Sequence, residues 1–336
     1  MAAPPTSERP RVLITRRVFQ DLQARLAEHF EVRDNPADAV WSGAELREQL
    51  AGCVGLMCTA GERVDVALLD AHPQLRVVSN IAVGLNNIDL RACAARDVTV
   101  THTPDVLNET TADLGFALLL AAARKLSEAE RYLRRGDWSK WAIDQFAGAD
   151  VHGSTLGILG MGRIGQAIAR RGALGFGMKV VYHNRSPLPA EAEQALGARW
   201  VTKDGLLAEA DHLVLVLPYS PASHHIIGAA ELAAMKPGAT LVNIARGGIV
   251  DDAALARALE AGTIGAAGLD VFENEPALHP ALLAAPNLVL TPHIGSGSMA
   301  TRRAMVGLAV DNLIAALGCG PDAGRPPAPA PRPAPA

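Results

Sequence analysis

The sequence predicts an α/β protein built from two doubly wound parallel-sheet domains. The first observation is a glycine-rich turn at residues 160–165, Gly-Met-Gly-Arg-Ile-Gly, which lies between an apolar strand pattern and a helical pattern. The second is that short β-like runs and helical patterns alternate before this turn, and the third is that they alternate again after it. Such alternation is typical of open parallel sheets.

The first domain is predicted over residues 1–106. Its β-like runs occur at 11–15, 53–58, 75–79 and 98–102, and its clearest helical patterns at 19–26 and 44–50. Each run is short, apolar and separated from the next by a helical or turn-rich stretch, so we expect the runs to form one parallel sheet.

The second domain is predicted over residues 107–299. A long helical pattern runs from Asn108 toward Arg135 and breaks at Gly136. Strand patterns follow at 155–159, 178–182, 212–217, 240–244, 266–270 and 288–290, with a helix expected at 251–261. An amphipathic helix at 300–317 comes after the last strand. Residues 319–336 are mostly Pro, Ala and Gly without periodicity, so we expect a disordered tail.

Composition excludes several classes of function. The 336 residues are enough for two domains, and the net charge of −4 offers no electrostatic footprint for nucleic acid. Cys53, Cys58, Cys93 and Cys319 form no CxxC pair and have no histidine at zinc-ligand spacing, so we expect reduced thiols and no metal site. The amino terminus lacks a signal-peptide pattern, and the most apolar window, 114–123, is too short to span a bilayer. We therefore expect a cytoplasmic protein with no membrane partner.

The glycine turn has the spacing of a dinucleotide site. In such a site Gly160 makes the tight turn, Gly162 lets the backbone approach the pyrophosphate, and Gly165 lets the helix pack on the strand. The free N–H groups of the following helix would then face the phosphates. The strand before the turn and the helix after it favour this interpretation over that of a simple loop.

The second strand of the nucleotide domain predicts which cofactor is preferred. An NAD site normally carries an acid about 20 residues after the glycines, to bind the ribose 2′-hydroxyl. Residues 178–187 contain no acid. Arg185 can instead pair with a 2′-phosphate, and Asn184 and Ser186 can donate hydrogen bonds to it. The alternative is a surface turn whose acid was lost, so we predict NADP(H) as preferred and NAD(H) as possible.

Three residue types suited to carbonyl reduction follow consecutive strands. Arg246 follows the strand at 240–244, three acids follow 266–270, and His293 follows 288–290. Arginine can hold a substrate carboxylate through two hydrogen bonds, and a protonated histidine can give its proton to the carbonyl oxygen as hydride arrives at carbon. A neighbouring carboxylate would favour the charged imidazole. Taken singly, each residue could equally be a surface or structural group.

The chain resembles the D-isomer-specific 2-hydroxyacid dehydrogenases from about residue 10 to 318. The resemblance rests on the runs at 160–165, 243–247 (Asn-Ile-Ala-Arg-Gly), 268–276 (Gly-Leu-Asp-Val-Phe-Glu-Asn-Glu-Pro) and 292–296 (Pro-His-Ile-Gly-Ser). It implies a flavodoxin-like substrate domain over 1–106 and 300–318, a Rossmann nucleotide domain over 107–299, and a cleft between them.

The resemblance also implies roles for individual residues. The catalytic residues would be Arg246, Glu275 and His293, with Asp270 contacting the nicotinamide amide. Backbone amides of Val83 and Gly84 would bind the substrate carboxylate. Many relatives carry an aromatic residue and Asp after that glycine, and this chain has Leu and Asn instead. The cofactor-binding residues would be Gly160, Gly162, Arg163, Ile164, Gly165, Asn184, Arg185, Ser186, Leu217, Pro218, Ser223, Ala245, Asp270, Gly295 and Thr111.

Within the family the chain is most similar to bacterial glyoxylate/hydroxypyruvate reductases that also reduce 2-ketogluconate. The runs at 103–107, 136–138 and 150–152 and the acid-free 182–186 carry this similarity. It implies an NADPH-preferring reductase of small 2-keto acids. One alternative is an NAD-linked D-2-hydroxyacid dehydrogenase of the D-lactate type. Another is a non-catalytic dinucleotide sensor, because transcriptional corepressors share the fold and these residues.

Assembly is predicted from the segment after the long apolar helix. That helix is apolar around much of its surface and needs cover on more than one side, and Trp138 and Trp141 lie just beyond it. The nucleotide domain alone could supply that cover. The resemblance implies instead a homodimer through the nucleotide domains, in which Trp141 contributes to the partner's substrate pocket.

Overall fold

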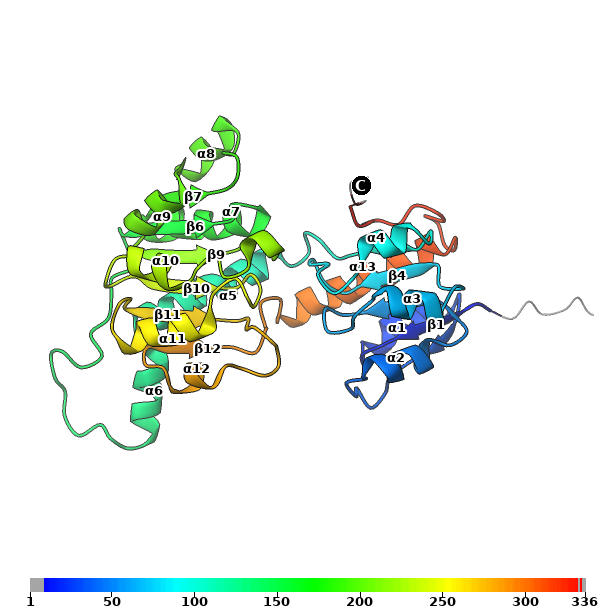
Figure 1. The fold of residues 1–336 in the computed structure, drawn as a ribbon, viewed down its shortest axis with the longest axis horizontal. Helices are drawn as coiled ribbons and strands as arrows, with labels where there is room; N and C mark the ends of the chain where they lie inside the picture. Colours follow the sequence, from blue (N-terminus) through cyan, green and yellow to red (C-terminus); the bar gives the residue numbers. More distant parts are fainter. Residues whose placement is uncertain (1–8, 332, 334–336) are drawn as a thin grey trace, which may run out of the picture. The chain divides into compact units, whose positions relative to one another are not determined.

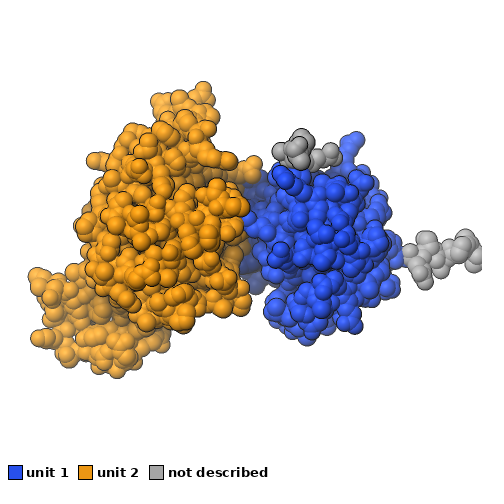
Figure 2. All heavy atoms as spheres, in the orientation of Figure 1, with its two compact units in different colours: residues 1–107, 298–336 blue, residues 108–297 orange. Residues whose placement is uncertain are grey.

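The computed structural model describes residues 9–331 and 333, which form two compact units (Figures 1 and 2). Unit 1 contains the described residues up to Leu107 and from Ser298 onward, and unit 2 is Asn108–Gly297. The domain boundaries predicted after residue 106 and before residue 300 lie close to the two points where the chain passes from one unit to the other. Among the described helices, none has both the length and the apolar character of a membrane-spanning segment.

Unit 1 contains a five-stranded sheet in which every strand pair is parallel. The order is β2-β1-β3-β4-β5, the flavodoxin-like arrangement. The strands are β1 (Arg11–Ile14), β2 (Glu31–Arg33), β3 (Cys53–Cys58), β4 (Val77–Asn80) and β5 (Thr99–Thr101). The sequence pattern missed β2, because this short edge strand reads Glu-Val-Arg and buries none of its side chains fully.

Helices cover both faces of this sheet, and each face has its own apolar core. One face carries α2 (Gly43–Leu50), α3 (Val66–Ala71) and α4 (Leu90–Ala94), and the other carries α1 (Gln20–Ala27) and α13 (Met299–Ala316). A capping box between Ser42 and Glu45 begins α2. Helix α13 comes from the far end of the sequence, yet Leu313 and Leu317 pack on Gly55 of the central strand β3. Unit 1 therefore needs both ends of the chain to complete its core.

The segment after α13 differs from the predicted disordered tail. Ala330 donates its N–H to the carbonyl of Val100 at 2.8 Å, and Pro329 forms an antiparallel bridge with Thr101. Figure 1 shows this segment in red beside α4, with which it lines a cavity of about 380 Å³. Composition misled the prediction because Ala330, between two prolines, still supplies a hydrogen-bond donor that the free edge of β5 accepts. Residues 332 and 334–336 of the predicted tail lie outside the described residues.

Unit 2 contains a seven-stranded parallel sheet of order β12-β11-β10-β9-β6-β7-β8. The strands are β6 (Thr155–Leu159), β7 (Lys179–His183), β8 (Ala198–Trp200), β9 (His212–Leu215), β10 (Thr240–Asn243), β11 (Ala266–Leu269) and β12 (Leu288–Leu290). Strand order reverses between β6 and β9, as in Rossmann folds, and ligands bind at such a switch point. The predicted fold class, two doubly wound parallel sheets, is confirmed.

Helices sandwich the sheet of unit 2 between two apolar cores. One core is covered by α5 (Asn108–Ala123) and α7 (Arg163–Arg170), and α7 runs on into a π-helical turn at Arg171–Gly175. The other core is covered by α9 (Lys203–Glu209), α10 (Ala229–Ala234), α11 (Asp252–Glu260) and α12 (Pro280–Ala284), while α8 (Ala190–Leu196) follows β7.

The predicted helix from Asn108 toward Arg135 is in fact two helices. Helix α5 ends at Ala123, and α6 (Leu126–Arg134) begins after Lys125, whose φ of 53° is left-handed. The sequence pattern missed this break because no Gly or Pro marks it. Helix α6 and the segment after it extend away from the sheet of unit 2 (Figure 1). No residue of α6 is buried, so this segment contributes little to the core of unit 2.

Candidate functional site

The three glycines of the turn after β6 differ in the space that surrounds them. Gly160 has a φ of 103°, and a Cβ there would lie 2.8 Å from the backbone nitrogen of Leu217. A Cβ on Gly165 would collide with the carbonyl oxygen of Gly160. A Cβ on Gly162 would meet no described atom within 4 Å. Open space at the second glycine, with crowding at the first and third, is what a bound pyrophosphate requires.

The glycine turn is held against the end of the next strand. Gly160 donates its N–H to the carbonyl of His183 at 3.1 Å, and Met161 donates to Oδ1 of Asn184 at 2.7 Å. Trp200 donates its indole N–H to the carbonyl of Asn184 at 3.0 Å. Asn184 therefore shapes the turn with its oxygen, a role that the sequence did not indicate, and its side-chain nitrogen is the group left for a ligand.

A cavity of about 760 Å³ lies over the carboxyl ends of β6, β7 and β9. Its lining includes eight predicted cofactor residues: Gly160, Gly162, Asn184, Arg185, Ser186, Leu217, Pro218 and Ser223. Within the part of the chain that the structure describes, no Asp or Glu contributes to this lining. Arg185 is exposed there, and its guanidinium has no carboxylate partner among residues 9–331 and 333. An unpaired cation in an acid-free cavity suits a phosphate better than a ribose hydroxyl.

The other predicted cofactor residues do not line this cavity. Arg163 and Ile164 begin α7, Ala245 is buried after β10, and Thr111 is buried in α5 close to the Gly295 backbone. Ser223 uses its hydroxyl within its own turn: it donates to the carbonyl of Pro218 or Ser220 and accepts the Ser220 N–H at 2.7 Å. Ser223 therefore shapes the cavity wall.

Arg246 lies in a turn at the end of β10 that side-chain hydrogen bonds of Asn243 stabilise. Asn243 accepts the Ala245 N–H at 3.0 Å and donates to the carbonyl of Arg246 at 3.1 Å. A side chain on Gly247 would collide with the carbonyl of Phe272, so only glycine lets this turn meet the loop after β11. Burial lowers the pKa of Arg246, and the negative charge of Glu275 opposes that shift. The sequence analysis missed Asn243, although it opens the run at 243–247.

His293 and Glu275 form a hydrogen-bonded pair. Nδ1 of His293 lies 2.7 Å from Oε2 of Glu275, and Oε1 of Glu275 accepts the Phe272 N–H at 2.8 Å. Burial alone would raise the pKa of Glu275, but the His293 hydrogen bond, the Phe272 N–H and the charge of Arg246 outweigh it and the pKa is lowered. The carboxylate therefore stays ionised and holds the Nδ1 proton, which leaves Nε2 of His293 for a substrate.

Asp270 fixes the loop that carries His293. Oδ1 of Asp270 accepts the Thr291 hydroxyl at 2.7 Å and the Ile294 N–H at 2.8 Å, while Oδ2 accepts the Gly295 N–H at 2.8 Å. The carbonyl of Asp270 accepts the His293 N–H at 2.9 Å. Burial raises the pKa of this 1 % exposed carboxyl group. The three bonds to the Asp270 carboxylate and the one to its carbonyl define the loop, and the contact of Asp270 with nicotinamide remains a prediction.

The predicted carboxylate-binding turn lies in unit 1, after β4. Within residues 9–331 and 333, no acceptor is found for the N–H groups of Val83 and Gly84. Both residues are half-buried, as is Leu85. Two adjacent backbone donors of this kind can bind an anionic oxygen.

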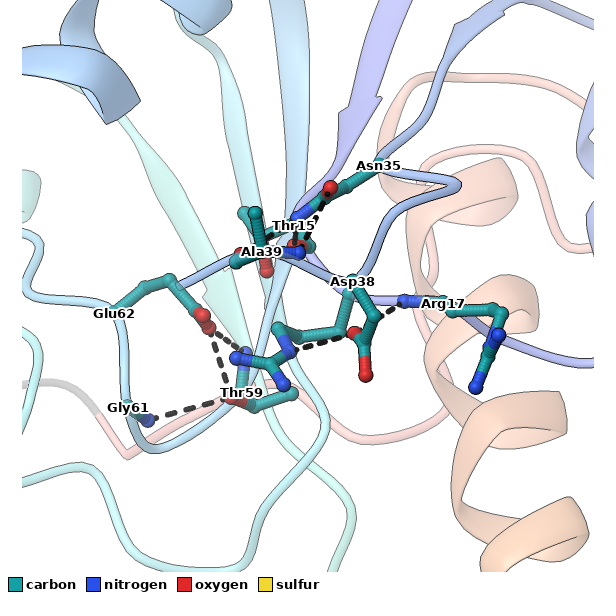
Figure 3. A network of polar contacts seen from close by, with 9 residues as sticks. Thr15, Arg17, Asn35, Asp38, Ala39, Thr59, Gly61 and Glu62 are labelled. Carbon is teal, nitrogen blue, oxygen red and sulfur yellow. Dashed lines mark hydrogen bonds and ion pairs between the residues drawn. The ribbon is translucent and has the colours of Figure 1, made fainter. Parts of the chain in front are cut away.

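A polar network that the sequence analysis missed lies beyond β1, β2 and β3 of unit 1 (Figure 3). Asn35 donates from Nδ2 to the carbonyl of Thr15 at 2.9 Å, and Asp38 accepts the Arg17 N–H at 3.0 Å. Glu62 accepts both the N–H and the hydroxyl of Thr59, at 2.7 and 2.8 Å. Because these groups satisfy one another, the network shapes the loops at the carboxyl edge of the sheet.

One group of described side chains has the composition of a metal site, which the sequence analysis did not predict. Ligand atoms of His224, His225 and Glu273 lie within 4.8 Å of one another. The two imidazoles stack with centroids 3.9 Å apart and planes 21° from parallel, so their in-plane lone pairs do not converge on one point. Nε2 of His225 also lies 2.9 Å from Oε2 of Glu273. The arrangement is that of a hydrogen-bonded pair with a stacked neighbour.

Comparison with known proteins finds a family model that matches unit 2. Residues 116–295 match the family described as D-isomer specific 2-hydroxyacid dehydrogenase, NAD binding domain. This range lies within unit 2, which therefore binds a nicotinamide dinucleotide.

Relatives match over nearly the whole chain. A glyoxylate reductase of Thermococcus onnurineus is 46% identical over 311 residues, 91% of this chain and 92% of the relative. A glyoxylate/hydroxypyruvate reductase B of Klebsiella pneumoniae is 45% identical over 92% of this chain and 95% of its own. The crystal structure of an NADPH-dependent glyoxylate/hydroxypyruvate reductase of Sinorhizobium meliloti, in complex with NADP and malonate, superposes with a TM-score of 0.80 at 39% identity, covering 96% of this chain and 97% of its own.

Proposed function

Because this chain belongs to the D-isomer-specific 2-hydroxyacid dehydrogenase family, we propose that it reduces the 2-keto acids glyoxylate and hydroxypyruvate to D-2-hydroxy acids, with NADPH as preferred cofactor. The observation that carries the proposal is the His293–Glu275 pair, held at 2.7 Å on loops that Asp270 and Phe272 fix. The relatives named glyoxylate and hydroxypyruvate reductases support this substrate class. Reduction of 2-ketogluconate is a further possibility for the same site.

His293 is the proposed general acid. A reduced nicotinamide, when bound, supplies the hydride for the keto carbon. His293 gives the proton on Nε2 to the carbonyl oxygen, while Glu275 accepts the hydrogen bond from Nδ1 and holds the imidazole charged and oriented. Glu275 can do this because its lowered pKa keeps it ionised across the neutral range.

The substrate carboxylate is the proposed ligand of two groups of donors. In unit 2, Arg246 offers a guanidinium whose burial makes an anionic partner favourable. In unit 1, Val83 and Gly84 offer the two backbone N–H groups that have no acceptor among the described residues. Each set would bind the carboxylate rather than the reacting carbon, so each would orient the substrate and discriminate against neutral carbonyl compounds.

Arg185 supports the proposed preference for NADPH over NADH. The guanidinium lies in a cavity whose described lining contains no carboxylate, and Ser186 lines the same cavity. A 2′-phosphate would gain charge-assisted hydrogen bonds there, whereas a ribose hydroxyl would find no carboxylate to accept its hydrogen bond. The Sinorhizobium meliloti relative is described as NADPH-dependent, which supports the same preference. NAD(H) would remain usable, because the glycine turn would hold the pyrophosphate that both cofactors share.

We also propose that the protein is a homodimer. Leu126, Leu133, Trp138, Trp141 and Ile143 are each more than half exposed in α6 and the segment after it. Exposed apolar side chains gathered in one segment mark an interaction surface. A second copy is the proposed partner, with Trp141 reaching its substrate pocket.

The decisive experiment is a steady-state assay with glyoxylate, hydroxypyruvate, 2-ketogluconate and pyruvate, each with NADPH and with NADH. We expect the highest kcat/KM for glyoxylate or hydroxypyruvate with NADPH. Preference for pyruvate with NADH would favour a D-lactate type of enzyme instead. Tight binding of NADPH without turnover of any 2-keto acid would identify a dinucleotide sensor, the second function that these residues permit.

A further inference from the structure

Three successive carbonyl groups of the proposed carboxylate-binding turn accept hydrogen bonds from other residues of unit 1. The Ala82 carbonyl accepts the Thr103 N–H at 3.0 Å, and the Val83 carbonyl lies 3.1 Å from Nδ1 of His102. The Gly84 carbonyl accepts from Nδ2 of Asn80 at 2.9 Å. A carbonyl can only accept, so His102 carries its proton on Nδ1.

These bonds decide where the N–H groups of the turn point. In a trans peptide the C=O and the N–H of one unit lie in one plane and point in opposite directions. The carbonyl of Val83 and the N–H of Gly84 belong to the same trans peptide, and the carbonyl of Ala82 and the N–H of Val83 to the one before it. The Gly84 N–H therefore points away from the His102 imidazole, and the Val83 N–H points away from the Thr103 backbone.

The backbone N–H and the carbonyl of His102 are both hydrogen-bonded. It donates its N–H to the carbonyl of Ala328 at 3.1 Å, and its carbonyl accepts from Nδ2 of Asn312 at 3.0 Å. Oδ1 of Asn312 accepts the Ala328 N–H at 2.8 Å. Asn312 is fully buried in α13, so its amide is committed to joining His102 to the C-terminal segment.

The C-terminal segment supplies only the donors that this arrangement needs. Residues 326–331 read Pro-Pro-Ala-Pro-Ala-Pro, so Ala328 and Ala330 provide the N–H groups and the prolines provide none. Ala328 binds Asn312, and Ala330 binds the carbonyl of Val100 within β5. The rigid prolines lower the entropy that this short segment loses on docking.

We propose that the segment 328–330, through Asn312, locks His102 as a positioning residue for the Val83 and Gly84 amides, and so sets the affinity for the keto acid. This inference rests on the proposed function, because it takes those amides as the carboxylate donors. It predicts that segment 328–330, which is remote in sequence from every proposed catalytic residue, affects KM for the substrate. The rates of hydride and proton transfer should not change.

The first test compares His102→Leu with His102→Asn. Leucine removes the donor to Val83, whereas Nδ2 of asparagine reaches nearly the position of the imidazole Nδ1 and can replace it. We expect His102→Leu to raise KM for glyoxylate by about 2- to 10-fold, the value of one neutral hydrogen bond. Values of kcat and of KM for NADPH should stay unchanged, and His102→Asn should restore most of the substrate affinity.

The second test shortens the chain. Ending it after Pro331 keeps both alanines and should leave KM for glyoxylate unchanged, whereas ending it after Gly324 removes the segment and should raise KM as His102→Leu does. Combining the shorter chain with His102→Leu should add little, because both changes break one coupled unit. Circular dichroism of each variant checks that unit 1 remains folded.

The outcomes separate this inference from the proposed function. A normal KM in His102→Leu, or an equal loss in His102→Asn, would overturn the positioning role of His102 while the reductase assignment stands. Full additivity of truncation and His102→Leu would overturn the lock by the C-terminal segment. If the unmodified chain reduces no 2-keto acid, the proposed function is wrong and this inference falls with it.

Discussion

Nδ1 of His293 lies 2.7 Å from Oε2 of Glu275, and the other oxygen of that carboxylate is held at 2.8 Å by the Phe272 N–H. Because the backbone fixes one oxygen, the second can point only at the imidazole. The pair is therefore oriented before any substrate arrives, and it presents Nε2 as the one ring nitrogen free to exchange a proton with a ligand.

Replacing Glu275 by Gln should change how reduction depends on pH. The lowered pKa of Glu275 keeps it charged, and that charge favours the protonated imidazole of His293. Glutamine removes that charge, so the alkaline limb of the kcat/KM profile for glyoxylate should move toward acid. Profiles of both proteins in the same buffers measure the shift. An alkaline limb that stays in place would remove Glu275 from this role.

His293→Ala should reduce kcat by about 10²–10⁴, the usual contribution of a general acid, while NADPH still binds. Fluorescence titration with NADPH checks binding independently of turnover. His225→Ala is the matched control, because His225 forms a similar pair with Glu273 at 2.9 Å but is not assigned to chemistry. Equal losses in the two variants would show that the loops, rather than the proton donor, had been disturbed.

Arg185→Ala should raise KM for NADPH by about 10- to 100-fold and leave KM for NADH nearly unchanged, because one charge-assisted phosphate contact is lost. Arg199→Ala is the control: Arg199 lies on the neighbouring edge strand β8, is paired with Glu209, and does not line the cavity. Kinetics with both cofactors measure the effect. Equal changes for NADPH and NADH in Arg185→Ala would contradict the phosphate assignment.

Asp252→Asn should stabilise the protein above neutral pH. Burial raises the pKa of Asp252 from 3.8 to about 6, so the folded chain binds this proton more tightly than the unfolded chain does. The free energy of unfolding therefore falls as pH rises from about 4 to 6 and stays lower above that window. Asparagine does not titrate, and we expect a gain of about 1–3 kcal/mol at pH 8.

Urea denaturation at several pH values measures this gain. The difference between Asp252→Asn and the unmodified chain should shrink from pH 8 to pH 5 and disappear below about pH 4, where both side chains are neutral. Asparagine can still accept the Glu273 N–H that Asp252 accepts at 3.3 Å, so the loop itself is kept. A pH-independent difference would point to packing instead of charge.

The homodimer proposal predicts twice the chain mass of 35.1 kDa by light scattering at micromolar concentration. Trp141→Ala should leave NADPH binding intact and change the ratio of kcat/KM between glyoxylate and a bulkier 2-keto acid, since the exposed indole is the proposed wall of the partner's pocket. Trp138→Ala offers a comparison in the same segment. A fully active monomer would refute the proposal.

Much of the fold follows from local sequence signals. The glycine spacing at 160–165 and the alternation of short apolar runs with helical patterns predict two parallel sheets, because these patterns report which residues face a core. The break at Lys125 and the edge strands β2 and β8 did not show in the sequence. A left-handed lysine carries no compositional mark, and polar edge strands are held by pairing with their neighbours rather than by burial.

The candidate site also has features that the sequence predicts and features that only the tertiary structure reveals. The sequence by itself determined that an arginine, three acids and a histidine stand at the ends of successive strands, because residue type and strand order are local properties. Only the tertiary structure decided how the acids are used: Asp270 binds the backbone of the His293 loop, Glu273 pairs with His225, and Glu275 pairs with His293. Asn274, with its left-handed φ of 64°, lies between Glu273 and Glu275, and the loop through it carries the two carboxylates to different histidines. Such partners come from segments distant in the chain, so residue type and spacing alone did not pair them, and only the family resemblance singled out Glu275 and Asp270.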